Sequence, residues 1–477
     1  MSRTKLLKFA SFIFLAAILF SVPVITNAQS KKDRKAAQRL VRDADTLYRQ
    51  RDYSGAIEKY AEALVLVPKY PYAHLSKAFS HLRLNQNDLA LNDLTAALNQ
   101  GHSPLEVYRV RWEVYFEKGD LEAALADVKA AQKLAPDDTS YHVAEGRILN
   151  KRGKYLEALE KFDRAINLGT NDGNVYYYKA NSYHKTGDYA QQESSARKAL
   201  ASGAKCAGEC WFLIGDHLQR QRKYQDAVTA YQTSIASSDG IRDSYYNLAE
   251  THRLRNEFSK AVKIARAGSQ RFPDDAGLKV ALIRYYSLDG NNGFAVKVGE
   301  EAIGLLPNNA TAYKNLCRAL SYQGQYYYDR KAQSMADKSF DKAIQHCTRA
   351  LKLKPDDGES QYYLGRTYQL KGNSALSESF YKKSITGLLE FTDNNPDDAD
   401  GFHILGNAYF TTVQYKKAID AYEKCLKISP RFAEVMFNLG YAYHLSNNRP
   451  KALEQVLKLE KIDPVRAEKL RKVIDGN

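Results

Sequence analysis

The chain has 477 residues, of which 44% are hydrophobic and 26% are charged. This length exceeds what one ordinary globular core covers, so several domains or a repeat array are expected. The composition excludes a disordered chain and a polytopic membrane protein. The formal net charge of +15 is compatible with anionic partners, and equally with a solvated surface of positive bias.

The first 28 residues have the features of a signal peptide. Basic residues precede the apolar stretch FASFIFLAAILFSV (9–22), Pro23 ends it, and Ala28 offers a small-residue cleavage site. The apolar stretch is short for a membrane-spanning helix. We therefore expect a cleaved leader at 1–28 and a mature chain in the periplasm or cell envelope, or secreted. An uncleaved anchor is the alternative.

A small residue recurs at a regular interval along the rest of the chain. The first series is Ala56, Ala90, Ala124, Ala158, Gln192, Ala227, Ala261, Ala295, Ala343, Ser384, Ala418 and Ala452. A second series about twelve residues upstream is Ala44, Ala78, Trp112, Gly146, Ala180, Gly215, Ala249, Ile283, Cys317, Gly365, Gly406 and Gly440. Most steps are 34 residues, which is typical of a stacked array of about twelve units.

The spacing within each unit predicts two helices joined by a short turn. Apolar residues recur at helical intervals, and the two series of small residues would face each other so that the two backbones approach closely. An aromatic residue four positions later (Tyr60, Phe162, Tyr231 and Tyr422) would fill the space beside this contact. Eight prolines fall twelve residues after the first series, where the second helix should end. Because a lone hairpin leaves one apolar face in water, the units must stack.

Segments such as FHILGNAYFTTVQYKKAIDAYEKCLKISP (402–430) resemble tetratricopeptide (TPR) repeats. The resemblance covers nearly the whole mature chain. It implies an all-α fold, a right-handed TPR superhelix or α-solenoid over 29–464, and we expect the polar segment 465–477 to form a capping helix. In this family the first helix of each hairpin lines a concave groove in which ligands usually lie.

Two steps of the first series are longer than the rest. Ala295 to Ala343 spans 48 residues and Ala343 to Ser384 spans 41, so the additions are 14 and 7 residues, within 318–342 and 366–383. Since these are close to four and two helical turns, we expect lengthened helices in repeats nine and ten rather than loops. Such a projection would suit docking, and tolerated length drift is the alternative.

The resemblance locates a candidate partner groove on the first helices of repeats five to ten. Aromatic candidates hold equivalent positions, acidic candidates accompany them, and basic candidates follow in later repeats. The candidates are Tyr177, Phe212, Tyr246, Glu209, Asp216, Asp243, Glu250, Arg284, Lys314, Arg318 and Arg366. The arginines at 284, 318 and 366 occupy one slot in three successive repeats and should form a ladder able to bind carboxylates or phosphates. The alternative is that these side chains are merely solvated.

Cysteine pairs offer two candidate disulfides in an exported chain. Cys206 and Cys210 lie at the entry to the sixth repeat, at a spacing compatible with bridging. Cys317 and Cys347 should be neighbours in the ninth hairpin, where two buried thiols are the slightly favoured interpretation.

The sequence favours an interaction protein over an enzyme. It contains no zinc-protease motif, no phosphate-binding loop and no segment left for a catalytic domain. We expect no cofactor and no metal. The leading hypothesis is a non-enzymatic scaffold or adaptor outside the cytoplasm, which binds an extended peptide or protein segment in the groove. The alternative is a polyanion, such as an envelope polymer, phosphorylated glycan or nucleic acid, bound by the basic ladder.

Overall fold

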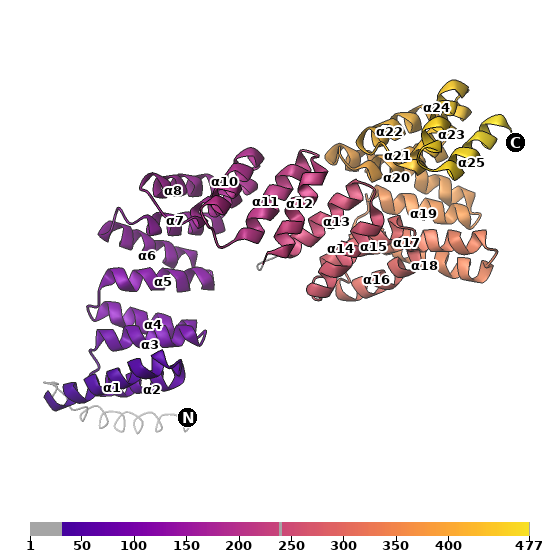
Figure 1. Ribbon diagram of the computed structural model, residues 1–477. Helices are drawn as coiled ribbons and strands as arrows, with labels where there is room; N and C mark the ends of the chain where they lie inside the picture. Colours follow the sequence, from indigo (N-terminus) through magenta and orange to yellow (C-terminus); the bar gives the residue numbers. More distant parts are fainter. Residues whose placement is uncertain (1–30, 238–240, 477) are drawn as a thin grey trace, which may run out of the picture. The chain divides into compact units, whose positions relative to one another are not determined.

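The computed structural model describes residues 31–237 and 241–476, so the expected signal peptide at 1–28 lies outside the described residues. Within these ranges the chain forms twenty-five α-helices and no β-strand (Figure 1). None of the helices described there is both long enough and apolar enough to cross a bilayer. The chain divides into an N-terminal unit, up to Asn171, and a C-terminal unit from Asp172 onward.

The N-terminal unit consists of four helical hairpins. Their helices are α1 (Lys31–Arg49), α2 (Tyr53–Leu66), α3 (Pro71–Arg83), α4 (Asn87–Asn99), α5 (Pro104–Lys118), α6 (Leu121–Leu134), α7 (Thr139–Lys151) and α8 (Tyr155–Asn167). Each helix packs on the next, so the unit is a continuous stack.

The C-terminal unit continues the pattern with eight hairpins and a final helix. They are α9 (Asn174–Thr186), α10 (Tyr189–Ala201), α11 (Ala207–Arg220), α12 (Tyr224–Ala236), α13 (Arg242–Leu254), α14 (Phe258–Arg271), α15 (Ala276–Leu288), α16 (Asn292–Leu305), α17 (Ala310–Asp329), α18 (Gln333–Leu353), α19 (Gly358–Leu370), α20 (Ser374–Asn394), α21 (Ala399–Thr411), α22 (Tyr415–Ile428), α23 (Ala433–Leu445), α24 (Arg449–Glu460) and α25 (Pro464–Asp475). Helix α25 packs on α23 and α24.

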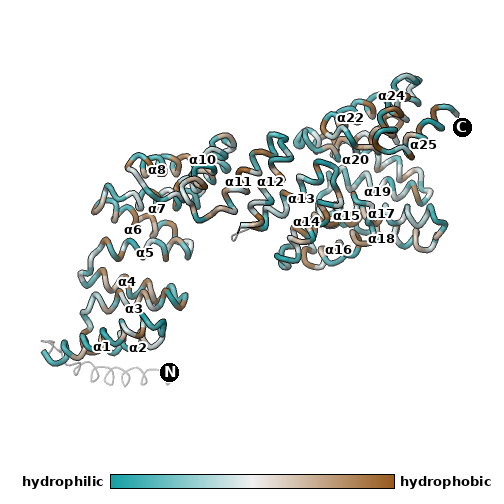
Figure 2. Tube along the Cα trace, viewed as in Figure 1, coloured by the Kyte–Doolittle hydropathy of each residue, from teal (hydrophilic) through white to brown (hydrophobic). Residues whose placement is uncertain are grey.

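The small residues hold the two helices of each hairpin together, as the spacing predicted. All twelve members of the first series are fully buried. At Gly146 a β-carbon would lie only 2.4 Å from the ring of Phe162, and at Gly406 only 2.4 Å from the ring of Tyr422. Figure 2 shows that each helix carries both hydrophilic and hydrophobic residues, as expected for helices with one buried face.

Aspartates begin many of the helices. Asp52, Asp120 and Asp188 each accept a hydrogen bond from the backbone N–H three residues on. Such a cap satisfies one of the backbone donors that a helix start leaves without an intrahelical partner. The short turns therefore end the first helix and start the second without leaving a buried backbone N–H group unpaired at the start of the second helix.

Gln192 departs from the small-residue pattern but is accommodated. Its side chain is fully buried, donates to the backbone oxygen of Leu213 at 2.7 Å and contacts His184 at 3.2 Å. A buried amide costs little when its polar atoms are hydrogen-bonded, which explains why the fifth hairpin still forms.

The two long steps of the repeat are extra helical turns, as expected. Helices α17 and α18 have 20 and 21 residues, against 13 and 14 in α15 and α16. In repeat ten α19 keeps 13 residues, and the whole addition lies in α20, which has 21. Whole turns preserve the buried face of each helix, so the stack continues through both insertions.

Candidate functional site

The predicted aromatic residues lie on three first helices that contact one another in turn, α9, α11 and α13. Tyr246 is 42% exposed. Tyr177 and Phe212 are half-buried, and the ring of Phe212 lies 6.0 Å from that of Tyr231. Burial, followed by the charge of Glu209, raises the pKa of Tyr177, so its hydroxyl stays protonated.

The predicted acidic residues have partners within the chain. Asp216 accepts a hydrogen bond from Arg220 at 3.1 Å. Although burial opposes the charged carboxylate, His184 and Arg220 hold the pKa of Asp216 below its ordinary value. Asp243 pairs with its neighbour Arg242. Glu209 lies half-buried in the first turn of α11.

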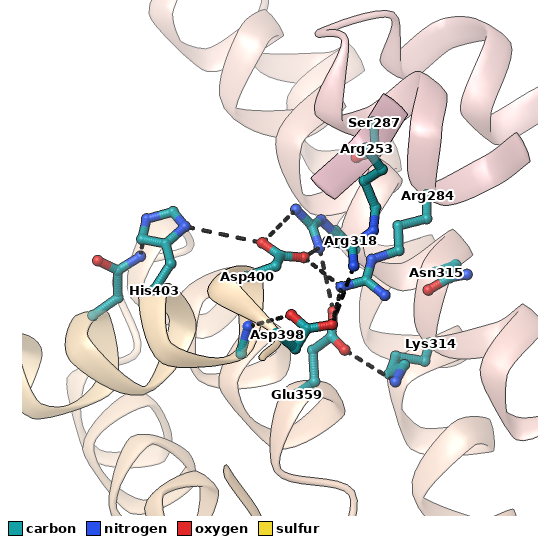
Figure 3. A network of polar contacts seen from close by, with 12 residues as sticks. Arg253, Arg284, Ser287, Lys314, Asn315, Arg318, Glu359, Asp398, Asp400 and His403 are labelled. Atoms are coloured by element: carbon teal, nitrogen blue, oxygen red, sulfur yellow. Dashed lines mark hydrogen bonds and ion pairs between the residues drawn. The ribbon is translucent and has the colours of Figure 1, made fainter. Parts of the chain in front are cut away.

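Three of the four predicted basic residues, Arg284, Lys314 and Arg318, converge on carboxylates of the chain itself (Figure 3). Arg284 on α15 and Arg318 on α17 each lie 2.8 Å from Asp400, which stands in the first turn of α21. Arg318 and Asp400 are each 3% exposed. Burial opposes the charge of Asp400, yet Arg318 and Arg284 outweigh it and hold its pKa well below the ordinary value.

Four further charges extend this cluster, which we term the ionic network. Lys314 lies 2.9 Å from Glu359, and Glu359 also lies 3.3 Å from Arg318. Arg253 lies 3.4 Å from Asp398, the residue that caps α21. The network therefore joins the first helices of repeats seven, eight and nine to repeats ten and eleven.

Glu250, another predicted groove residue, borders the network. It pairs with Arg253 at 2.6 Å and accepts a hydrogen bond from the hydroxyl of Tyr285 at 2.9 Å. Burial opposes its charge, but Arg253 holds the pKa of Glu250 below its ordinary value. The charged side chains of these first helices are therefore mostly buried and paired with one another.

Arg366 does not join the other two arginines. Its guanidinium donates to the hydroxyl of Ser321 at 2.9 Å and lies 4.5 Å from the ring centre of Tyr322. Only Arg284 and Arg318 of the predicted ladder therefore share a carboxylate.

The start of α21 explains why the carboxylates are held there. The segment NNPDDAD (394–400) places Asp398 at the cap, where it accepts from the backbone N–H of Gly401 at 2.9 Å. The positive end of a helix dipole favours negative charge at this position. Asp400, the second residue of the helix, then projects toward Arg318 and Arg284 (Figure 3).

Four residues of the network were missed by the sequence analysis. They are Arg253, Glu359, Asp398 and Asp400. The acidic helix start at 397–400 was the one signal that could have directed attention to them. A helix cap explains Asp398 by itself, however, so the sequence alone did not require an arginine partner.

A separate hollow of about 410 Å³ lies in the N-terminal unit. It is lined by Asp45, Tyr48, Arg49, Tyr60, Tyr72, Leu75, Ser76 and Phe79. The hydroxyls of Tyr60 and Tyr72 both donate to Asp45, at 2.5 and 3.3 Å. Tyr72 is 45% exposed. Unlike the network, this hollow is lined by aromatic rings as well as charged groups and is partly exposed to solvent.

The structure corrects both cysteine predictions, the candidate bridge between Cys206 and Cys210 and the slightly favoured pair of buried thiols at Cys317 and Cys347. Cys206 and Cys210 are thiols. Cys210 faces the core of α11 and is fully buried, whereas Cys206 lies at the helix cap beside the Asn174 side chain. The disulfide instead joins Cys317 on α17 to Cys347 on α18.

Family models for the tetratricopeptide repeat match residues 41–104, 75–139, 109–174 and 212–276, and a TPR repeat model matches 406–447. Together these matches span about half of the sequence. The chain belongs to the tetratricopeptide repeat family.

Relatives of this TPR protein match only part of it. It is 24% identical over 302 residues to the TPR repeat-containing protein YvcD of Bacillus subtilis, covering 60% of this chain and 54% of that one. It is 21% identical over 248 residues to DnaJ homolog subfamily C member 3 of Gallus gallus, covering 47% of each. The chain thus spans about half the length of the curated relatives it matches. The solved structure of PilW, a type IV pilus biogenesis factor, is 16% identical with a TM-score of 0.41, covering 44% of this chain and 98% of that one.

Proposed function

We propose that this TPR protein is a non-enzymatic scaffold outside the cytoplasm that binds an extended peptide segment of a partner protein. TPR proteins bind protein or peptide partners, and the proposal adds the location, the form of the ligand and the surface. The observation that carries it is the aromatic hollow between α1, α2 and α3.

The hollow supplies both parts of a peptide-binding surface. The rings of Tyr48, Tyr72 and Phe79 provide rigid apolar area, and such residues are enriched where proteins bind one another. Asp45 and Arg49 provide one charge of each sign, which can orient a peptide backbone or its side chains. Because Asp45 already fixes the hydroxyls of Tyr60 and Tyr72, the hollow is organised before a ligand arrives.

The aromatic residues of α9, α11 and α13 support a second stretch of groove in the C-terminal unit. Tyr246 is the most exposed of the three, and Tyr177 and Phe212 hold equivalent places on the two preceding first helices. We assign them the same role, contact with apolar side chains of an extended segment.

We do not extend the proposal to a polyanion on the arginine ladder. Arg284 and Arg318 already bind Asp400, and Arg366 donates to Ser321. A polyanion would have to displace buried carboxylates before it could reach these guanidinium groups, and breaking a buried pair costs several kcal/mol.

Two features support a location outside the cytoplasm. One is the leader-like sequence at 1–28. The other is the disulfide between Cys317 and Cys347, because disulfides persist mainly in oxidising compartments.

The peptide proposal is tested by selecting ligands from a displayed random peptide library with the mature chain, then measuring affinities by fluorescence anisotropy. Tyr72→Ala should weaken the selected peptides about tenfold, as for a central aromatic contact. Leu156→Ala, at an exposed leucine of α8 in the same unit, should leave them unchanged. If Tyr246→Ala weakens them while Tyr72→Ala does not, the site lies in the C-terminal unit. Equal affinities for all variants would refute the proposal.

A further inference from the structure

The lengthened hairpin of repeat nine forms a step beside repeat eight. A first helix of 13 residues, as in α15, would end at Tyr322 if it began where α17 begins, at Ala310. Helix α17 instead continues to Asp329. Repeat eight has no matching extension, so the added turns of α17 stand beside the turn between α15 and α16.

The step borders an open hollow of about 550 Å³. One side is the α15–α16 turn with the start of α16, and the other is the added part of α17. The lining residues are Gly290, Asn291, Asn292, Gly293, Phe294, Lys297, Gln323, Tyr326 and Tyr327. Since Gln323, Tyr326 and Tyr327 all lie beyond residue 322, the hollow exists because of the insertion.

Large apolar side chains are exposed at this step. Phe294 of α16 is 61% exposed and Tyr326 of α17 is 49% exposed. Tyr328 and Met335, close to Tyr326 at the tip of the α17–α18 hairpin, are also exposed but do not line the hollow. Exposed apolar side chains scattered singly are normal, but a concentration around a hollow is typical of an interaction site. Solubility does not require exposed apolar side chains, so their presence on the added turns of α17 and α18 indicates another role.

The rings are held in place before any ligand binds. Phe294 stacks on Tyr286 with ring centres 5.6 Å apart. The guanidinium carbon of Arg330 lies 3.6 Å from the ring centre of Tyr326, which itself meets Tyr327 edge-on at 5.6 Å. Rings that are already fixed lose little conformational entropy on binding.

The charges of the lining indicate that the ligand carries negative charge. Lys297 is the one charged residue in the lining of this hollow, which includes no carboxylate, and Arg330 adds a second cation at its edge through its contact with Tyr326. The other polar groups are the amides of Asn291, Asn292 and Gln323 and the tyrosine hydroxyls. One N–H of the Asn291 amide already donates to Asp289 at 2.7 Å, and the remaining N–H and O–H groups can donate hydrogen bonds to carbonyl oxygens.

We infer that the step binds a proline-rich, extended segment of a partner protein that carries a carboxylate beside its prolines. A polyproline II segment has no internal hydrogen bonds, so its carbonyls are free to accept from the amides and hydroxyls of the lining. Its proline rings fit between aromatic side chains, which is how such segments are recognised in general. The carboxylate is complementary to Lys297 and Arg330. The volume suits a few residues rather than a helix.

The test uses the full mature chain and a fluorescein-labelled peptide of six prolines followed by two glutamates, measured by fluorescence anisotropy. Tyr326→Ala and Phe294→Ala should each weaken binding about tenfold. Leu376→Ala, at an exposed leucine on the other insertion-bearing helix, α20, should not. Lys297→Glu should favour a matching peptide with two lysines in place of the glutamates. Tyr72→Ala should have no effect, which separates this site from the hollow of the N-terminal unit.

Several outcomes would overturn the inference. One is no binding of the proline peptide to the unaltered chain, and another is binding that Tyr326→Ala and Phe294→Ala leave unchanged. A third is binding of neutral oligosaccharides on a glycan array that Tyr326→Ala abolishes while the proline peptide fails to bind, because this would assign the step to sugars. Circular dichroism melting of each variant checks that the fold is retained.

Discussion

Asp400 lies 2.8 Å from the guanidinium of Arg318, although 82 residues separate them in sequence. Both side chains are almost completely buried. The same carboxylate also binds Arg284 at 2.8 Å. The arginines that looked like a site for a partner's carboxylate are therefore occupied by carboxylates of the chain's own repeats ten and eleven.

Replacing Asp400 should destabilise the C-terminal unit strongly. Asp400→Asn keeps the size of the side chain but leaves Arg318 and Arg284 with one buried anion fewer. Removing one partner of a buried pair costs about 3–5 kcal/mol because the remaining charge stays desolvated. Urea unfolding followed by circular dichroism measures this loss. The exposed Asp393 of α20 provides the control, and Asp393→Asn should change the free energy of unfolding by less than about 0.5 kcal/mol. A loss below about 1 kcal/mol for Asp400→Asn would show that the network is solvated.

The ionic network also predicts how stability depends on pH. The pKa values of Asp398 and Asp400 are lowered in the folded chain, where burial opposes their charge but Arg253, Arg284 and Arg318 outweigh it. Groups with a lowered folded pKa bind fewer protons in the folded state, so their contribution is complete above the ordinary value near 3.8 and is lost as the pH falls below it.

We therefore expect the free energy of unfolding to fall steeply below about pH 4, with little change due to these groups from about pH 5 to 8. Urea titrations across this range measure it. In Asp400→Asn the fall should be smaller, because one of the two carboxylates no longer titrates. If the free energy of unfolding of both proteins fell equally below pH 5, this assignment would be contradicted.

The repeat pattern was sufficient to predict the hairpins but not the network. A small residue every 34 positions indicates a contact between the two helices of a hairpin. Ala343 and Ser384 remain fully buried even after the long steps. The extra residues could be predicted as helical turns because their numbers match whole turns. The contact of Arg253 with Asp398 spans four repeats. It depends on small rotations between successive hairpins that no residue period encodes.

The cysteines show that sequence spacing also does not determine contacts between residues close in the chain. Cys206 and Cys210 are close in sequence, but the helix that begins between them turns Cys210 into the core. Cys317 and Cys347 are 30 residues apart, and the hairpin brings them together.

The Cys317–Cys347 disulfide should contribute substantially to stability. Closing a loop of 30 residues in the unfolded chain stabilises the folded state by roughly 3.5 kcal/mol in the chain-entropy model. A reductant should therefore lower the free energy of unfolding by about this amount. The matched control is the double variant Cys317→Ala/Cys347→Ala, whose stability the reductant should not alter. If the reductant shifts both proteins equally, its effect has another source.

The close approach at Gly406 gives a prediction about packing. A β-carbon there would lie 2.4 Å from the ring of Tyr422, so Gly406→Ala should destabilise the C-terminal unit by about 1–3 kcal/mol. Gly304→Ala, on α16 where no atom lies within 4 Å, should be neutral or stabilising, because alanine favours a helix by up to about 1 kcal/mol. Urea unfolding of both variants measures the difference. In a Tyr422→Leu background the cost of Gly406→Ala should shrink, since the clashing ring is gone, and a double-mutant cycle isolates this coupling. An undiminished cost would mean that the penalty arises from the backbone and not from the ring.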